Sequence, residues 1–162
     1  MDKTDPPTSF GVFNPVGHIV IAYRSPADLR AAVTALGERG IGKPDWVYYT
    51  PEEMTTQVDK QLASASALAS IGQDLNLIKA HRELAQNGCS FLVVQAPDDE
   101  RAERVTLVAR ATNAVAAQRY GRFIVEELID LPPGQKQVFE SPDRGLDMDM
   151  DVNAEVLHAE TR

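Results

Sequence analysis

Three histidines are the side chains of this sequence best suited to acid and base chemistry near neutral pH. His81 lies between Leu77 and Leu84, at the i, i+4 and i+7 spacing that places side chains on one face of a helix. No neighbouring residue in the sequence supplies the partner that would orient a catalytic imidazole. We therefore interpret His81 as a hydrogen-bonded residue of a core or an interface.

An enzyme or a ligand sensor would need further polar side chains beside this histidine. In that case the catalytic candidates are His81, His18 and Tyr23, and the ligand-binding candidates are Gln95 and Tyr48. They would line a pocket between a sheet and a helical region, suited to a small apolar or aromatic molecule. The histidines and the single cysteine show no metal-binding spacing, so we expect no cofactor. Cys89 follows a helix-ending glycine and precedes a buried strand, so we expect an inert thiol.

The C-terminal residues contain part of a calcium-loop pattern. Asp149, Asp151, Asn153 and Glu160 fall at positions 1, 3, 5 and 12 of an EF-hand loop. Ala154 stands where the sharp turn of that loop requires glycine. These residues are a weak calcium candidate, and we interpret them as part of a solvated acidic tail.

The same tail alternates apolar and acidic residues from Leu146 to Val152. This period of two is typical of a strand on an exposed sheet edge, and it predicts that the tail packs against its own domain or a partner subunit. The alternative is a disordered acidic and hydrophobic segment. Equal thermal stability of the full chain and of residues 1–141 would refute the packing.

Gly37–Lys43 matches the G-x-x-x-x-G-K part of a phosphate-binding loop. Pro44 follows, where that motif has the serine or threonine that ligates magnesium. The motif also requires a strand before it and a helix after it, whereas here a helix ends and a strand begins. We interpret these residues as a helix end and a turn, and we reject ATP hydrolysis.

The charge of the chain argues against several classes of partner. The 162 residues carry a net charge of -8, and residues 130–162 contain eight acidic and three basic side chains. An acidic chain without a basic cluster is a poor partner for nucleic acid or an anionic membrane. The longest apolar run is far shorter than a membrane helix, and the N-terminal residues do not resemble a signal peptide. We expect a soluble cytoplasmic protein.

The apolar pattern predicts strands at 18–23, 45–49, 91–94 and 120–129. Helices are predicted to begin at Pro26, Pro51 and residues 97–100, each behind a capping residue or a capping box. The helical region 51–87 is too long for a simple crossover, so we expect it to break near Ser70–Gly72 and to double back.

This order of elements favours an α+β fold. A returning helical region makes the third strand antiparallel to the second, as in a ferredoxin-like split βαβ sandwich whose central hairpin is replaced by helices. The buried first and third strands would be central, and the second and fourth would lie at the edges. The alternative is a flavodoxin-like parallel α/β sheet. The predicted organisation is an N-terminal arm (1–16), one domain (17–129, with the helical excursion 51–87) and an acidic C-terminal tail (130–162).

Residues 17–50 carry a resemblance to a known group of proteins. A strand, then Ser25–Asp28, Ala31–Leu36 and Gly40–Ile41, then a tyrosine-rich strand, is similar to small bacterial general-stress or heat-induced α+β domains of uncharacterised activity. Residues 90–125 repeat this pattern more loosely. The resemblance implies a cytoplasmic, stress-associated protein, and it supplies no catalytic residues.

Small residues at 63–70 would let another helix approach closely, within the chain or across a symmetry axis. We therefore expect self-association as a homodimer. The sequence favours a non-enzymatic stress-associated binding or protein-interaction domain. The alternative is a small enzyme or ligand sensor that uses a histidine.

Overall fold

The computed structural model describes residues 3, 8–9, 12–13, 15–63, 75–122 and 124–132. The chain divides into two units, Met1–Pro132 and Pro133–Arg162. All of the described residues belong to the first unit, so the account below concerns that unit alone. The candidate calcium ligands Asp149, Asp151, Asn153 and Glu160 and the alternating segment 146–152 lie outside the described residues, as do 64–70 of the stretch of small residues.

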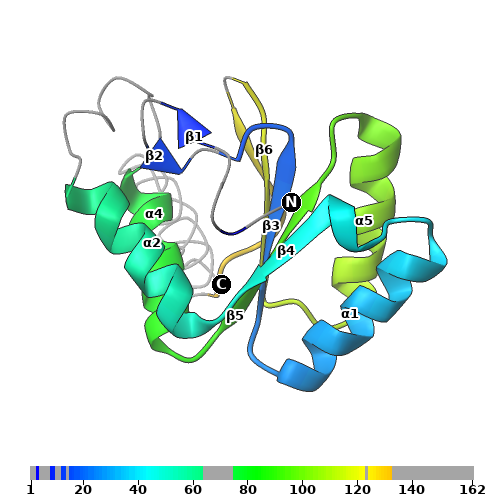
Figure 1. The fold of residues 1–162 in the computed structure, drawn as a ribbon, viewed down its shortest axis with the longest axis horizontal. Coiled ribbons are helices and arrows are strands. Elements are labelled where there is room, and N and C mark those ends of the chain that lie inside the picture. Colours follow the sequence, from blue (N-terminus) through cyan, green and yellow to red (C-terminus); the bar gives the residue numbers. More distant parts are fainter. Residues whose placement is uncertain are drawn as a thin grey trace, which may run out of the picture. The chain divides into compact units, whose positions relative to one another are not determined.

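A five-stranded sheet forms the centre of the first unit (Figure 1). Its strands lie in the order β4-β5-β3-β6-β7, and every neighbouring pair is antiparallel. Their bounds are β3 (His18–Tyr23), β4 (Trp46–Tyr49), β5 (Ser90–Gln95), β6 (Ala116–Tyr120) and β7 (Val125–Ile129). The short strands β1 (Thr8–Ser9) and β2 (Val12–Phe13) form a separate antiparallel pair. The antiparallel pairing excludes the parallel, flavodoxin-like alternative.

Helices cover both faces of the sheet. Figure 1 shows α1 (Pro26–Glu38) and α5 (Asp99–Ala111) on one face, and α2 (Pro51–Ala63) and α4 (Leu75–Gln86) on the other. A single turn of 3-10 helix, Lys43–Asp45, leads into β4. None of the helices in the described ranges has the length and apolar character needed to cross a lipid bilayer.

The helical region between β4 and β5 returns the chain to the edge that it left, as predicted. Helices α2 and α4 pack against each other, and β5 pairs with β4 in antiparallel register from Tyr49 opposite Phe91 to Trp46 opposite Val94. A connection that packs as a pair of helices on one face can join neighbouring antiparallel strands without crossing the sheet.

The predicted single strand at 120–129 is wrong. Residues 116–120 and 125–129 form two strands joined by a turn, in which the Gly121 amide donates to the Ile124 carbonyl at 2.9 Å. The fourth strand, β6, is therefore interior, and β7 gives the sheet a fifth strand that the expected arrangement does not have. The sequence did not predict that β6 begins at Ala116, because Ala116 and Ala117 have a low preference for strands.

Local signals placed the helix ends correctly. Thr50 and Glu53 form the predicted capping box, with the Glu53 amide donating to Thr50 Oγ1 at 3.2 Å and the Thr50 amide donating to Glu53 Oε2 at 2.9 Å. The Arg101 amide donates to Asp98 Oδ1 at 2.7 Å at the beginning of α5. Gly40, with φ of 75°, follows the end of α1, in the left-handed region that glycine adopts most easily.

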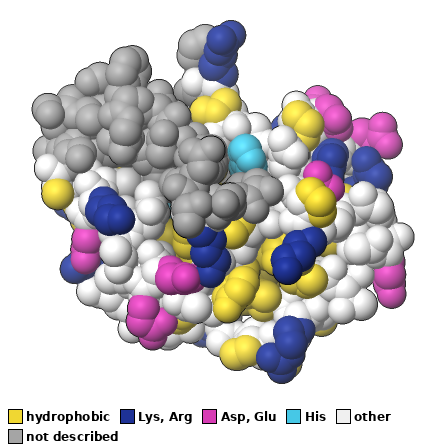
Figure 2. Space-filling view, viewed as in Figure 1, with side chains coloured by type: hydrophobic (Ala, Val, Ile, Leu, Met, Phe, Trp, Pro, Cys, Tyr) yellow, Lys and Arg dark blue, Asp and Glu magenta, His cyan; other side chains and the backbone are white. Residues whose placement is uncertain are grey.

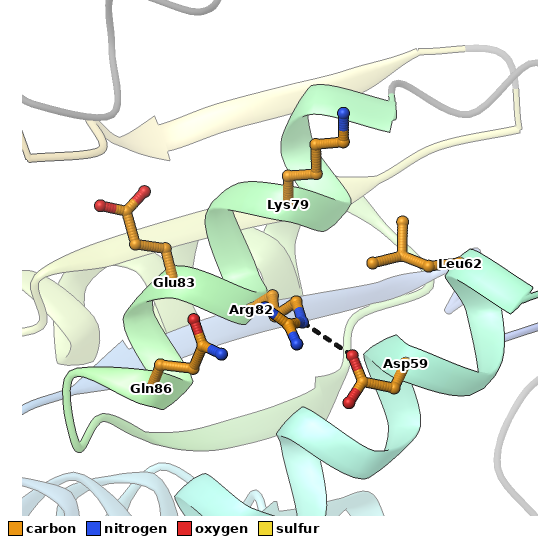
Figure 3. A pocket seen from close by; sticks show the side chains of 6 residues that line it. All are labelled: Asp59, Leu62, Lys79, Arg82, Glu83 and Gln86. Atoms are coloured by element: carbon orange, nitrogen blue, oxygen red, sulfur yellow. Dashed lines mark hydrogen bonds and ion pairs between the residues drawn. The ribbon is translucent and has the colours of Figure 1, made fainter.

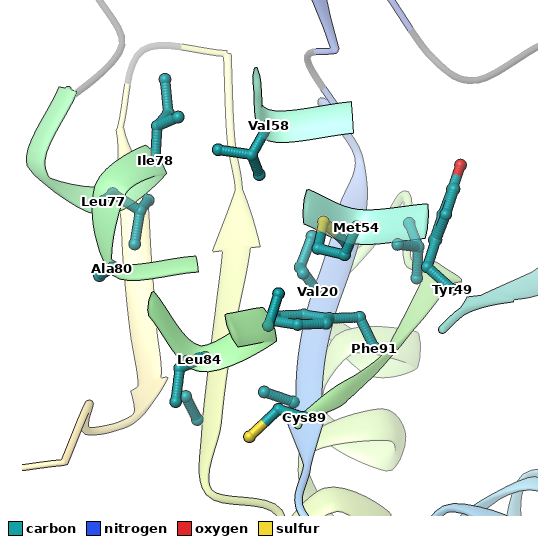
Figure 4. Packing of buried hydrophobic residues seen from close by; sticks show 14 of the residues in the cluster. Val20, Tyr49, Met54, Val58, Leu77, Ile78, Ala80, Leu84, Cys89 and Phe91 are labelled. Carbon is teal, nitrogen blue, oxygen red and sulfur yellow. The ribbon is translucent and has the colours of Figure 1, made fainter. Parts of the chain in front are cut away.

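The sheet separates two apolar cores. Figure 4 shows the core beneath α2 and α4, where Met54 and Leu84 pack with Val20 and Phe91. The opposite core joins α1 and α5 to residues such as Ile19 and Leu92. Because β3 and β5 bury side chains on both faces, they are central, as their nearly continuous apolar sequences predicted.

Candidate functional site

His81 lies in the core beneath α4. Its side chain is 5% exposed and packs edge-on against the Phe91 ring, with 5.7 Å between the ring centroids. His81 Nε2 lies 2.8 Å from Gln118 Oε1, an amide oxygen that can only accept, so Nε2 carries the proton and donates it. Burial lowers the pKa of the imidazole, more than the hydrogen bond raises it, and this favours the neutral ring.

Gln118 on β6 completes this polar pair. Its side chain is buried, and Nε2 has no hydrogen-bond partner among the described residues. The four grooves considered below have neither His81 nor Gln118 in their walls. This geometry agrees with the interpretation of His81 as a hydrogen-bonded core residue.

Tyr23, the second catalytic candidate, lies on the opposite face of the sheet. Its side chain belongs to the core beneath α1 and α5, whereas His81 packs against Phe91 in the other core. The Tyr23 hydroxyl and Thr112 Oγ1 are 2.9 Å apart, and Thr112 Oγ1 donates to the Val108 carbonyl at 2.7 Å, so Tyr23 donates to Thr112. Burial is the main cause that raises the pKa of Tyr23.

His18 begins β3 and is half-buried. Its Nδ1 donates to the Val16 carbonyl at 2.9 Å, and its backbone lies opposite Gln95 and Tyr120. Gln95 is exposed at the end of β5. The structure therefore places His18 beside Gln95, as neighbouring residues at one end of the sheet, while Tyr23 lies at the other end of β3.

Two features concern metals and the thiol. Among the described residues, no cluster of histidine, cysteine, aspartate and glutamate could hold a metal ion. Cys89 is fully buried, and burial is the main cause that raises the pKa of its thiol. A raised pKa lowers the fraction of reactive thiolate at neutral pH.

Four grooves in the described part of the surface differ in charge. One groove, of about 440 Å³, lies between α2 and α4 (Figure 3), and in it Arg82 Nε donates to Asp59 Oδ1 at 2.7 Å. A second of about 440 Å³, at the turn between β6 and β7, contains Glu126. A third of about 270 Å³, between α5 and β7, contains Asp99 and Glu103. Each of these three grooves includes at least one carboxylate.

The fourth groove, between α1 and β4, has a different character and is named here the α1–β4 groove. Its volume is about 550 Å³, and no carboxylate lines it. Its lining residues are Pro26, Leu29, Arg30, Val33, Thr34, Trp46, Tyr48 and Ser90. Two aromatic side chains thus lie in one groove with Leu29 and Val33 of α1, a combination typical of sites that bind peptides or small apolar molecules.

Tyr48 is the predicted ligand-binding candidate that the structure places in this groove. Its side chain is 40% exposed, and Lys3 Nζ lies 4.5 Å from the centre of its ring. Trp46, two residues earlier on the same face of β4, was missed. An aromatic strand bounded by Pro44 and Pro51 was the signal that could have indicated it, because such short strands lie at sheet edges.

Comparisons with known proteins do not assign the chain to a family. No family model, no curated protein and no solved structure matches the chain.

Proposed function

We propose that this chain is a non-enzymatic protein-interaction domain that binds its partner in the α1–β4 groove. The observation that carries the proposal is the exposed Tyr48 beside Trp46 on an edge strand, facing Leu29 and Val33 across the groove. Aromatic residues are enriched at protein interfaces because they bury a large area at a small cost in conformational entropy.

The buried polar side chains support a non-enzymatic role. His81 and Tyr23 are hydrogen-bonded within separate cores, and neither lines the α1–β4 groove. A general base must come within hydrogen-bonding reach of a substrate proton. Neither side chain has that access from this groove.

We further propose a ferredoxin-like sheet in a stress-associated, cytoplasmic homodimer. The antiparallel pairing of β3 with β5 and β6, and of β4 with β5, supports a ferredoxin-like arrangement to which β7 adds a strand. The resemblance of residues 17–50 supports a stress-associated, cytoplasmic role. The small residues at 63–70 support a homodimer.

Selection from a random peptide display library on the full-length protein tests the interaction function. We expect selected peptides that bind the wild type and lose binding to Tyr48→Ser. Leu107→Ser is the matched control, because Leu107 is 53% exposed on α5, outside the α1–β4 groove. Selection of no peptide, or equal loss of binding in both variants, would contradict a binding function of this groove.

A second candidate function is an enzyme or ligand sensor at His81. The observation that favours it is the buried Gln118 Nε2 without a partner among the described residues, a donor that a bound molecule could satisfy. Native mass spectrometry of the untreated protein tests it. A retained small molecule that Gln118→Leu abolishes would support this function, and a spectrum of the bare protein would contradict it.

A further inference from the structure

The α1–β4 groove has the composition of a site for a small organic molecule. Five of its eight lining residues are apolar or aromatic, and the other three, Arg30, Thr34 and Ser90, are polar. Its volume of about 550 Å³ lies within the range of roughly 300 to 1,000 Å³ that is usual for such sites. A mainly apolar wall binds the body of a ligand, and a few polar groups fix its orientation.

The aromatic side chains of β4 indicate what kind of ligand body fits. Trp46 and Tyr48 lie on the α1 face of the strand, because Val47 and Tyr49, which alternate with them, are buried in the core beneath α2 and α4. Offset or edge-to-face contacts between aromatic rings add to the free energy of burying their surface. The groove therefore favours a ligand with an aromatic body.

Arg30 gives this groove a positive charge that the described part of the protein does not neutralise. Its side chain is exposed, no carboxylate lines the groove, and none of the ion pairs among the described residues includes it. Asp28, two residues earlier in α1, accepts from Asn113 Nδ2 at 3.5 Å. Asp45, the residue before β4, pairs with Arg101 at 2.8 Å.

Lys3, a second cation near Tyr48, already has a partner. Its Nζ lies 2.7 Å from Glu53 Oε2 and 4.5 Å from the centre of the Tyr48 ring. Figure 2 shows hydrophobic side chains gathered on the face that presents β4, with lysine and arginine side chains beside them. Of Lys3 and Arg30, only Arg30 remains for a ligand, and a guanidinium binds a carboxylate through two parallel hydrogen bonds.

We propose that the α1–β4 groove binds a small aromatic carboxylate, with its ring against Trp46 and Tyr48 and its carboxylate on Arg30. The apolar side chains of Leu29 and Val33 on α1 contact the same ring. This inference goes beyond the proposed function, since the ligand site needs no protein partner. Because ligand and partner occupy the same groove, the ligand competes with the partner and so regulates the interaction.

The direct test is a calorimetric titration of the full-length protein with three probes that share a biphenyl body. The probes are biphenylacetate, its neutral amide and biphenylmethylamine, which is a cation at neutral pH. We expect saturable binding that weakens in this order, and a change in the emission of Trp46, the single tryptophan of the chain. Equal affinities for the carboxylate and the amide, or no saturable binding of biphenylacetate, would overturn the proposal. Binding without a change in Trp46 emission would place the ligand elsewhere and would also overturn it.

Matched arginine substitutions locate the carboxylate. Arg30→Gln should weaken binding of biphenylacetate about two- to fivefold, the usual size for an exposed ion pair, and should change the affinity for the amide by less than about twofold. Arg30→Glu should reverse the order, so that the amine binds more tightly than the carboxylate. Arg122→Gln, a change of an exposed arginine outside the α1–β4 groove, should leave all three affinities unchanged. The same order of affinities in wild type and Arg30→Glu would show that Arg30 does not bind the carboxylate.

Competition separates this inference from the proposed function. Biphenylacetate should displace a display-selected peptide whose binding depends on Tyr48. If such peptides bind but biphenylacetate does not, the ligand site is wrong and the interaction function stands. If biphenylacetate binds in an Arg30-dependent manner but no peptide is selected, the ligand site stands and the interaction function is wrong. Binding of both without displacement would overturn the shared site.

Discussion

At the scale of single residues, the hydrogen bond between His81 and Gln118 is the feature most open to test. Substitution of either residue leaves a buried polar group without its partner, which costs about 1 to 3 kcal/mol of unfolding free energy. We expect His81→Leu to cost more than Gln118→Leu, because the latter also removes the unpartnered Nε2. Replacing both residues with leucine should cost about 1 kcal/mol less than the sum of the single changes. Urea unfolding of the four proteins measures this coupling, and additive costs would contradict it.

The buried imidazole also predicts a pH dependence of stability. The pKa of His81 in the folded protein lies below its ordinary value of about 6.5, so the folded state binds fewer protons than the unfolded state at mildly acidic pH. The stabilisation is complete above about pH 6.5 and is lost as the pH falls toward the folded pKa, by at most about 1.4 kcal/mol per pH unit.

Urea unfolding at several pH values between 5 and 7.5 checks this sign. We expect His81→Gln to lose this component of the pH dependence, whereas His18→Gln, a change of the half-buried histidine at the beginning of β3, should keep it. The same slope in wild type and His81→Gln would show that other groups cause the dependence.

The environment of a residue could be predicted where residues of the same helix supplied the pattern, and not where its partners lie far away in the sequence. Helical spacing of leucines around His81 was enough to place it on a buried face, since that signal spans two turns of one helix. The partner Gln118 lies 37 residues away on β6, and no local pattern connects the two. Trp46 was missed for a related reason, because the opposite wall of its groove belongs to α1.

At the scale of elements, the beginning of α5 offers a matched pair of aspartates. Asp98 accepts the Arg101 amide at 2.7 Å, whereas the side chain of Asp99 is 96% exposed and pairs with Arg119. We expect Asp98→Ala to lower the unfolding free energy by about 1 kcal/mol, because it removes the N-cap. Asp99→Ala should change it by less than about 0.5 kcal/mol, because exposed ion pairs contribute little. Equal effects in denaturant unfolding would contradict the assigned cap.

The end of α1 offers a second matched pair of residues, the glycines at positions 37 and 40. Gly37 lies within the helix with open space around it, and Gly40 has φ of 75°. Alanine at position 37 should raise the unfolding free energy by up to about 1 kcal/mol, since glycine is a poor helix former. Alanine at position 40 should lower it by about 1 kcal/mol or more, because a Cβ atom disfavours the left-handed region. Opposite shifts of the thermal midpoint are the expected readout.

The ends of helices could be predicted from the sequence where capping residues next to them determine the end. Capping residues at Thr50, Glu53 and Asp98 act within one turn of helix, so the sequence alone located these helix ends. The hairpin of β6 and β7 was not predictable in the same way. Its alanines and glutamates have low strand preference, and pairing with β3 overrides that preference.

At the scale of the whole molecule, the length of the helical region between β4 and β5 predicts the antiparallel pairing of these two strands. The length of one straight helix over this region exceeds the width of the sheet, and this comparison alone predicts that the region doubles back. The face on which α2 and α4 pack, and the α1–β4 groove on the opposite face, depend on contacts between separate segments of the chain. The homodimer and the packing of the tail stay predictions.

We propose the α1–β4 groove as the binding surface of this protein. Backbone amide chemical shifts of the full-length, isotope-labelled protein, recorded during addition of a peptide selected from the display library, test this proposal. We expect the largest changes at residues of α1 and β4, from Leu29 to Val33 and from Trp46 to Tyr48, and little change along β7. Changes confined to β7 or to the groove between α2 and α4 would contradict a binding role of the α1–β4 groove.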